Sequence, residues 1–188
     1  LMIAIDYETF YSRQHTVSDM GPWAYAHHPD TDIYMVSVVG EGHNFVGDPK
    51  DFDWAQLEGK DLVSHNAAFD MVVTEGGISR EIIPPVNYRS WSCSADLMAY
   101  CGYPRALNNA AEQSLGIEVP KLMRNWMSGK HWSDAVEKGK AQELLDYALR
   151  DSEYCLQLWE KHHHQWPVPE RQLSAHTRTL IWRGVHVE

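Results

Sequence analysis

The sequence predicts an α/β protein in which α-helices flank a mixed β-sheet, and three observations support this prediction. Short apolar runs rich in β-forming residues fill the first part of the chain, and helical patterns fill the rest. The first apolar run also ends in acidic residues. Strands followed by helices are typical of a sandwich around one sheet, and 188 residues suffice for one buried core but are few for two full domains.

The first part of the chain contains four predicted strands. Leu1 to Asp6 is a short apolar run that ends at an acid, which suits a buried strand whose carboxyl end reaches a site. After a Gly21-Pro22 break, Ile33 to Val39 and Asn44 to Gly47 predict two strands joined by a glycine-containing turn. Asp61 to His65 predicts the fourth strand.

Short helices are expected between and after these strands. Residues 53–59 favour one or two helical turns, and residues 67–75 favour a helix that the Gly76-Gly77 pair ends. Residues 95–100 and 105–115 follow with helical patterns, and the second of these ends at a glycine, as helix C-termini often do.

The strongest helical signal runs from about residue 136 to residue 163, where apolar residues recur at three- and four-residue steps. This spacing predicts a long amphipathic helix. Pro167 and Pro169 then interrupt the chain before a last helical stretch over about residues 170–182.

The composition excludes several classes of protein. Apolar residues make up 44% and charged residues 22%, values that argue against disorder. No run approaches the roughly 18 apolar residues of a membrane-spanning helix, and the first residues lack the features of a signal peptide. We therefore expect a soluble cytoplasmic protein with no membrane partner.

Cysteine usage and charge narrow the classes further. Cys93, Cys101 and Cys155 form no CxxC pair, so neither a zinc knuckle nor a disulfide framework is expected. The 16 Lys and Arg against 26 Asp and Glu give a formal charge of −10, the wrong sign for a protein that coats nucleic acid. An enzyme that holds a nucleic-acid end through divalent metals remains possible, because bound ions compensate clustered carboxylates.

Three groups of residues are candidates for chemistry. Asp6 and Glu8 lie two residues apart, so an extended backbone places both carboxylates on one face. Asp70 follows the fourth predicted strand at the start of a helix, and Tyr147 and Asp151 share a face of the long helix. Each pattern alone has an ordinary alternative: acids of a solvated loop, a helix acid favoured by the dipole, and a partly buried tyrosine beside a surface acid.

The joint occurrence of the three groups points to a metal site. Four carboxylates from two strand ends and a helix would provide oxygen ligands, which Mg²⁺ and Mn²⁺ prefer. Two such ions about 3.5–4 Å apart can clamp a phosphodiester and activate water. Phosphodiester hydrolysis is therefore the natural interpretation.

The order and spacing of these residues resemble the DEDD superfamily of 3′–5′ exonucleases, in particular the proofreading domains of phage-type family A DNA polymerases. The superfamily's motifs Asp-x-Glu-Thr, Asn-x-x-x-Asp and Tyr-x-x-x-Asp match residues 6–9, 66–70 and 147–151. A histidine-type member would need histidine at position 146, where this chain has Asp146. The chain therefore resembles the tyrosine branch, and the resemblance implies a ribonuclease H-like mixed sheet flanked by helices.

The resemblance also implies roles for the motif residues. Asp6, Glu8 and Asp151 would ligate the first of two Mg²⁺ or Mn²⁺ ions, and Asp6 and Asp70 would serve the second. Tyr147 would orient the water that attacks the last phosphodiester of a single-stranded DNA 3′ end, which releases a 5′-mononucleotide. In relatives the terminal nucleotide is held at the places that match Thr9, Phe10 and Asn66.

The end of the chain suggests a division into two parts. Residues 172–188 are similar to the segment where such polymerases pass from exonuclease to polymerase domain. We therefore expect an exonuclease domain over residues 1–166 and a helical extension over residues 167–188. Because the chain begins with Leu1, we also expect it to be a piece of a longer protein with a covalently linked polymerase domain.

Two other interpretations remain open. The chain could be a stand-alone exonuclease that trims RNA, since the choice between RNA and DNA depends on a contact to the 2′-hydroxyl. It could also be an inactive module that binds nucleic acid or a partner, although the four acids and the tyrosine are all present. A basic stretch with interleaved tryptophans either guides a single strand or is a solvated loop; its charged residues are Lys121, Arg124, Lys130, Lys138 and Lys140.

Overall fold

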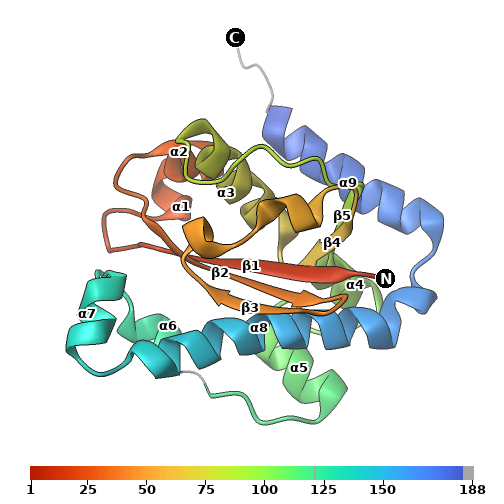
Figure 1. Ribbon diagram of the computed structural model, residues 1–188. Coiled ribbons are helices and arrows are strands. Elements are labelled where there is room, and N and C mark those ends of the chain that lie inside the picture. Colours follow the sequence, from red (N-terminus) through yellow and green to blue (C-terminus); the bar gives the residue numbers. More distant parts are fainter. Residues whose placement is uncertain (121, 184–188) are drawn as a thin grey trace.

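The computed structural model describes residues 1–120 and 122–183, and it contains a five-stranded mixed sheet in the order β3-β2-β1-β4-β5. The central strand β1 pairs antiparallel with β2 and parallel with β4, and β4 pairs parallel with β5 (Figure 1). The predicted α/β class with a mixed sheet is confirmed. The strands are β1 (Ile3–Thr9), β2 (Ile33–Gly40), β3 (His43–Gly47), β4 (Asp61–Ser64) and β5 (Ser90–Cys93).

Helices cover both faces of this sheet. The long helix α8 crosses one face, and α2 and α3 lie on the other (Figure 1). The helices described are α1 (Val17–Met20), α2 (Pro22–His27), α3 (Ala67–Ser79), α4 (Ser94–Tyr100), α5 (Leu107–Leu115), α6 (Leu122–Trp126), α7 (Trp132–Glu137), α8 (Ala141–His162) and α9 (Val168–Arg183). Short 3-10 turns occupy Pro49–Asp51, Trp54–Leu57 and His163–Gln165.

The alternation of side chains along β1 decides where its acids lie. Ile3, Ile5 and Tyr7 belong to the core cluster that includes Val73 of α3. Ala4 belongs to the cluster on the other face, which contains buried residues of α4, α5 and α8. Because successive strand residues point to opposite faces, Asp6 and Glu8 share the face of Ala4 and lie toward α8.

Small side chains let α8 approach the sheet closely. Ser152 of α8 is fully buried, and its hydroxyl lies 2.5 Å from the hydroxyl of Ser37 on β2. Ala148, one turn earlier, is also buried. A larger residue at either position would push α8 away from β1 and β2, since buried interfaces are closely packed. This contact therefore sets the distance between α8 and the acids of β1.

The predicted end of α3 at the glycine pair is wrong. The helix continues through Gly76 and Gly77 to Ser79 because both glycines serve close packing. A Cβ atom on Gly76 would lie 2.2 Å from the carbonyl oxygen of Ala26 in α2, and one on Gly77 would lie 2.6 Å from Ile83. Gly76 thus allows α2 and α3 to pack together, and Gly77 leaves room for the side chain of Ile83.

Other differences concern short elements. The sequence did not predict β5, the helices α1 and α2, or the helices α6 and α7. The predicted long helix begins at Ala141 and not at residue 136, because α7 ends before Gly139, which has a φ of +67°. Helix α5 ends at Gly116 in the left-handed conformation, as predicted.

Helix α9 packs against the edge strand β5 and is joined to β5 and to α4 by polar contacts. Buried Arg178 donates a hydrogen bond to the carbonyl of Trp91 at 2.7 Å, and Ser174 donates one to Asp96 at 2.5 Å. Residues 184–188, which close the predicted extension 167–188, lie outside the described residues, and the boundary at residue 166 stays a prediction. In the part of the chain that the structure describes, every helix is too short or too polar to span a membrane.

Candidate active site

The acids of β1 and α8 form one cluster. One carboxylate oxygen from each of Asp6, Glu8 and Asp151 can be chosen so that all three lie within 4.8 Å of one another. The three side chains are partly exposed to solvent. The structure therefore brings together, from opposite ends of the sequence, three of the four predicted ligands.

Tyr147 stands one helical turn before Asp151 on α8, and its side chain lines the same cavity as the three acids. Burial raises the pKa of its phenol, and the charges of Glu8 and Asp151 raise it further. The side chain is therefore a neutral phenol at neutral pH, able to donate one hydrogen bond and accept others.

The fourth predicted ligand, Asp70, comes from the first turn of α3, which begins where β4 ends. Its side chain has no exposed surface, and neither carboxylate oxygen has a hydrogen-bond partner among the residues that the structure describes. Burial raises its pKa well above the usual range, and the charge of Asp6 adds to the shift. The amides of Tyr7 and Asp70 oppose the shift but reach neither oxygen with the geometry of a hydrogen bond.

The other acids respond to burial in the same way. Burial raises the pKa values of Asp6 and Glu8 well above the ordinary range, and the neighbouring acids add to both shifts. The pKa of Asp151 rises to about 6, again through burial, while Tyr147 and nearby arginines oppose the shift. Without a cation, these neighbouring carboxylates repel one another, which favours protonation.

This arrangement fits divalent metal ions. A buried carboxylate without hydrogen-bond partners is costly unless a cation compensates it, and Asp70 meets this description. All the donors are carboxylate oxygens, which suit hard cations such as Mg²⁺ and Mn²⁺. Asp6, Glu8 and Asp151 could hold one ion, and Asp70 with Asp6 could hold a second.

A cavity of about 1300 Å³ opens in front of this cluster. Its walls come from the end of β1, from α1 and α2, from the starts of α3 and α5, and from α6, α8 and α9. Two residues predicted to hold a nucleotide, Thr9 and Asn66, line it. Asn66 has a φ of +72°, a left-handed conformation that Asn tolerates better than most residues.

The third residue of that group, Phe10, lies elsewhere. Its ring stacks on His131 with centroids 4.3 Å apart, and it lines a neighbouring cavity that also contains Arg80. The strand register changes between Glu8 and Thr9, where the end of β1 pairs with the start of β2. Because this irregularity ends the regular alternation before Phe10, the sequence could not show where that ring points. A nucleotide contact by Phe10 stays a prediction.

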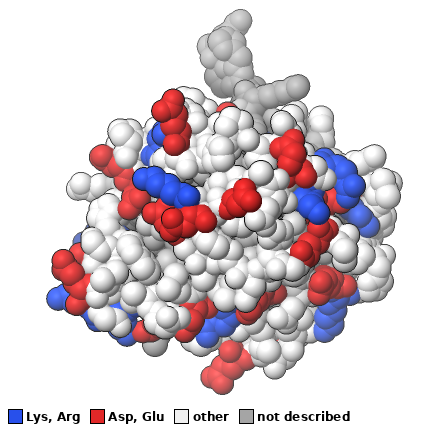
Figure 2. All heavy atoms as spheres, viewed as in Figure 1, with Lys and Arg blue, Asp and Glu red and all other residues white. Residues whose placement is uncertain are grey.

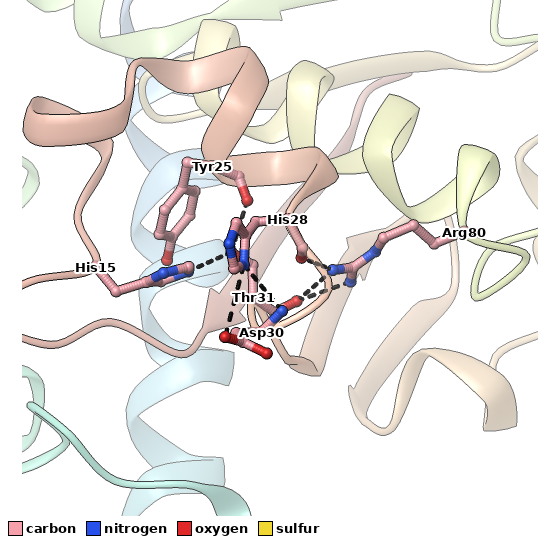
Figure 3. Close-up of polar contacts among 6 residues, drawn as sticks. All are labelled: His15, Tyr25, His28, Asp30, Thr31 and Arg80. Atoms are coloured by element: carbon pink, nitrogen blue, oxygen red, sulfur yellow. Dashed lines mark hydrogen bonds and ion pairs between the residues drawn. The ribbon is translucent and has the colours of Figure 1, made fainter.

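A polar cluster holds the segment that follows β1, and Figure 3 shows its members His15, Tyr25, His28, Asp30, Thr31 and Arg80. Tyr25 donates a hydrogen bond to the carbonyl of Phe10 at 2.6 Å, and its hydroxyl lies 2.8 Å from that of Thr9. Thr31 donates to the carbonyl of Tyr25 and lies 2.6 Å from a ring nitrogen of His15. These contacts fix the end of β1 and so the wall of the cavity.

Arg80 completes the cluster from the far end of α3. Its guanidinium donates to the carbonyls of His28 and Thr31, with distances of 2.8 and 2.7 Å to the latter (Figure 3). His28 in turn accepts a hydrogen bond from the amide of Asp30. The loop between α2 and β2 is therefore bound to α3.

Sequence reasoning missed several residues that line the cavity. His65 is one of them, and its two ring nitrogens lie 2.8 Å from the Ser94 hydroxyl and 2.5 Å from the Arg105 carbonyl. Burial lowers its pKa to about 4, so the ring is neutral. The cavity is also lined by Arg105, Arg124 and Tyr11. Of these three, the sequence pointed only to Arg124, which belongs to the basic stretch.

Comparisons with known proteins give likenesses in structure only. No family model and no curated protein matches the sequence. A solved structure of Brucella melitensis NrnC with bound Mg²⁺ is 15% identical, with a TM-score of 0.58, over 96% of this chain and 81% of that one. NrnC of the same organism bound to pGG is 17% identical, with a TM-score of 0.57, over 96% and 80%.

A third solved structure, described as the apo form of the nuclease, is 17% identical, with a TM-score of 0.55, over 85% of this chain and 70% of that one. At these identities the likeness concerns the fold. The chain has the mixed five-stranded sheet with flanking helices of the ribonuclease H-like fold, as the resemblance in sequence implied.

Proposed function

We propose that the protein is a divalent-metal-dependent 3′–5′ exonuclease that acts on short single-stranded oligonucleotides. The observation that carries the proposal is the convergence of Asp6, Glu8 and Asp151, with their ligand atoms within 4.8 Å, beside the unpartnered carboxylate of Asp70. The tyrosine expected for this chemistry, Tyr147, lines the same cavity.

The side chains divide the work of hydrolysis between them. Divalent ions held by the four acids would supply positive charge for the phosphate and acidify water. Tyr147, kept neutral by its raised pKa, orients the attacking water by a hydrogen bond and does not remove its proton. The wall around Thr9 and Asn66 holds the terminal nucleotide, so that only the last phosphodiester reaches the acids.

The charge distribution agrees with recognition of an end and not of a long duplex. The face in Figure 2 shows Lys and Arg scattered among Asp and Glu, without a continuous basic band. The formal charge of −10 disfavours nonspecific coating of phosphates. Affinity would then come from the cavity and its metals, which suits a short oligonucleotide.

The stand-alone exoribonuclease is the better supported form of the proposal. None of the three structures described above is named as a polymerase, and one of them is NrnC bound to pGG. A proofreading role on DNA and a linked polymerase domain draw no support from these likenesses. We therefore propose RNA as the preferred substrate, with DNA as the second candidate.

The test is digestion of 5′-labelled single-stranded RNA and DNA of the same sequence, with Mg²⁺ or Mn²⁺ and with EDTA as a control. The proposal expects stepwise shortening from the 3′ end and faster loss of RNA than of DNA. Faster loss of DNA would favour the proofreading interpretation. Absence of cleavage with either metal, in a protein shown to be folded, would leave the inactive binding module.

A further inference from the structure

Two arginines line the acidic cavity, and their side chains are used differently. Arg105 forms an ion pair with Asp96, with 2.7 Å between a guanidinium nitrogen and a carboxylate oxygen. Arg124 of α6 is exposed, and among the residues that the structure describes it has no ion-pair partner. Arg124 is therefore an exposed cation without an ion-pair partner among the described residues, and it lines the cavity that holds the acid cluster.

The rest of the basic stretch is used otherwise or lies away from the cavity. The Lys130 ammonium donates to the carbonyl of Trp126 at 2.6 Å and stands over that indole ring. Lys140 forms an ion pair with Glu143. Lys138 does not line the cavity, and Lys121 lies outside the described residues. Among the described residues of the basic stretch, Arg124 is therefore the cation that lines the cavity.

The backbone at Arg124 is held in place from both sides. Met123 and Met127 are buried in the cluster that also contains Ala148 of α8. The hydroxyl of Tyr11 donates a hydrogen bond to the carbonyl of Arg124, and the amide of Gly129 donates one to the carbonyl of Tyr11. Since Tyr11 follows β1, these contacts tie Arg124 to the strand that carries Asp6 and Glu8.

Arg124 lines the same cavity as Glu8 and Asp151, and its charge acts on both acids. Its charge lowers the pKa values of both Glu8 and Asp151, although burial outweighs this effect. No direct ion pair between Arg124 and these acids is present in the described residues. Among the described residues, Arg124 thus lines the cavity without an ion pair to these acids, as a group that binds a further anion would.

We infer, on the basis of the proposed function, that Arg124 binds a phosphate of the oligonucleotide at the mouth of the cavity. Its planar guanidinium can donate two parallel hydrogen bonds to two oxygens of a phosphate. Two divalent ions would neutralise the four carboxylates, so a phosphate that enters the cavity meets the positive charge of Arg124. Arg124 is therefore a substrate-contacting residue for binding and positioning.

The experiment compares the full chain with Arg124→Ala, Arg124→Lys and the control Lys138→Ala, which removes a charge from the same stretch outside the cavity. Cleavage of a labelled single-stranded oligonucleotide is measured as kcat/KM over a series of salt concentrations. Binding is measured in parallel by fluorescence anisotropy, and the effect of Mn²⁺ on Tm reports whether the acid cluster is intact.

The inference expects Arg124→Ala to lower kcat/KM and affinity by about 10- to 100-fold, the range of a hydrogen bond to a charged group. The slope of log affinity against log salt should fall by about 0.7, the loss of one phosphate contact on a single strand. Arg124→Lys should recover part of the affinity, and Lys138→Ala should behave as wild type. The rise of Tm with Mn²⁺ should not decrease, since the cation removed repels metal.

The outcomes separate this inference from the proposed function. If the wild type cleaves and Arg124→Ala cleaves and binds equally well, the inference is wrong and the proposed function stands. An unchanged salt slope together with a smaller effect of Mn²⁺ would mean that Arg124 only supports the fold of the site. If the wild type binds but does not cleave, the proposed function is wrong, and the anisotropy measurement still decides the role of Arg124.

Discussion

The substitution Asp70→Asn tests the physical argument for a metal site, because it should stabilise the metal-free protein while it removes the response to metal. Asp70 is fully buried, and in the described part of the chain neither of its carboxylate oxygens has a hydrogen-bond partner. The asparagine has nearly the same shape but cannot ionise, so it avoids the cost of a buried charge. An unsatisfied buried group costs about 1–3 kcal/mol, and a charged one more. For a chain of this size each kcal/mol moves Tm by about 2–4 °C.

The pKa shift of Asp70 determines whether the stability of the wild type rises or falls with pH. The folded-state pKa of Asp70 is raised, so between the unfolded and folded pKa values the folded protein binds the proton more strongly. The stability of the wild type therefore falls as the pH rises through this interval. Asp70→Asn lacks this loss, and its advantage in EDTA should grow with pH to about 1–3 kcal/mol above neutrality, which corresponds to roughly 2–12 °C.

The assay is thermal unfolding in EDTA and in Mn²⁺, with Asp146→Asn as the matched control. Asp146 is an exposed acid on α8 next to Tyr147 but outside the cavity lining. We expect the wild type and the control to gain Tm with Mn²⁺ and Asp70→Asn to gain much less. The reasoning is refuted if Asp70→Asn is less stable than wild type in EDTA above neutral pH, or if it retains the full response to Mn²⁺.

Three further predictions follow from the same contacts. The rise of Tm with Mn²⁺ should increase as the pH passes about 6, the pKa of Asp151, because the metal ligands must lose their protons. Unfolding curves recorded over a series of pH values measure this rise, and a rise that is the same at every pH would contradict the prediction. The neutral ring of His65, with a pKa of about 4, should make the wild type lose up to about 3 kcal/mol as the pH falls from about 6.5 to 4, since the unfolded chain binds the proton more strongly. His65→Gln should reduce this acid-limb slope in denaturant titrations, and an unchanged slope would assign the loss to other groups. Ser152→Leu should cost about 1–3 kcal/mol by overpacking and lower kcat, whereas Ser152→Ala should cost about 1 kcal/mol and leave kcat near wild type; equal rates for both would show that the spacing of α8 does not position Asp151.

The sequence predicted most accurately the elements in which buried apolar residues recur at the spacing of a strand or a helix. The apolar run before Asp6 gave β1, and the three- and four-residue spacing of apolar residues gave α8. The period of two in a strand placed Asp6 and Glu8 together, and the helical period placed Asp151 one turn after Tyr147. Asp6, Glu8 and Asp151 could be placed in one cluster because the spacing within each motif is local, and the role of the four acids as metal ligands stays a prediction.

The features that the sequence did not predict depend on contacts between segments that lie far apart in the chain. The strand β5 contains two serines in four residues and becomes a strand by pairing with β4, so its sequence carries little signal. Gly76 and Gly77 look like a helix end, but their role is contact with Ala26 and Ile83. Arg124 and Arg105 reach the cavity through the packing of α6 and of the loop before α5, which no local pattern reveals.

Cleavage by wild type, Asp151→Asn and Asp146→Asn of a 5′-labelled single-stranded oligonucleotide, in Mn²⁺ and in EDTA, tests the central claim most directly. We predict a ladder that shortens from the 3′ end for wild type and Asp146→Asn, and no product for Asp151→Asn or in EDTA. Cuts within the oligonucleotide would contradict the proposal that the protein is an exonuclease. Cleavage by Asp151→Asn at the wild-type rate, or a wild type that binds Mn²⁺ and oligonucleotide without hydrolysis, would contradict the assignment of the cavity as the active site.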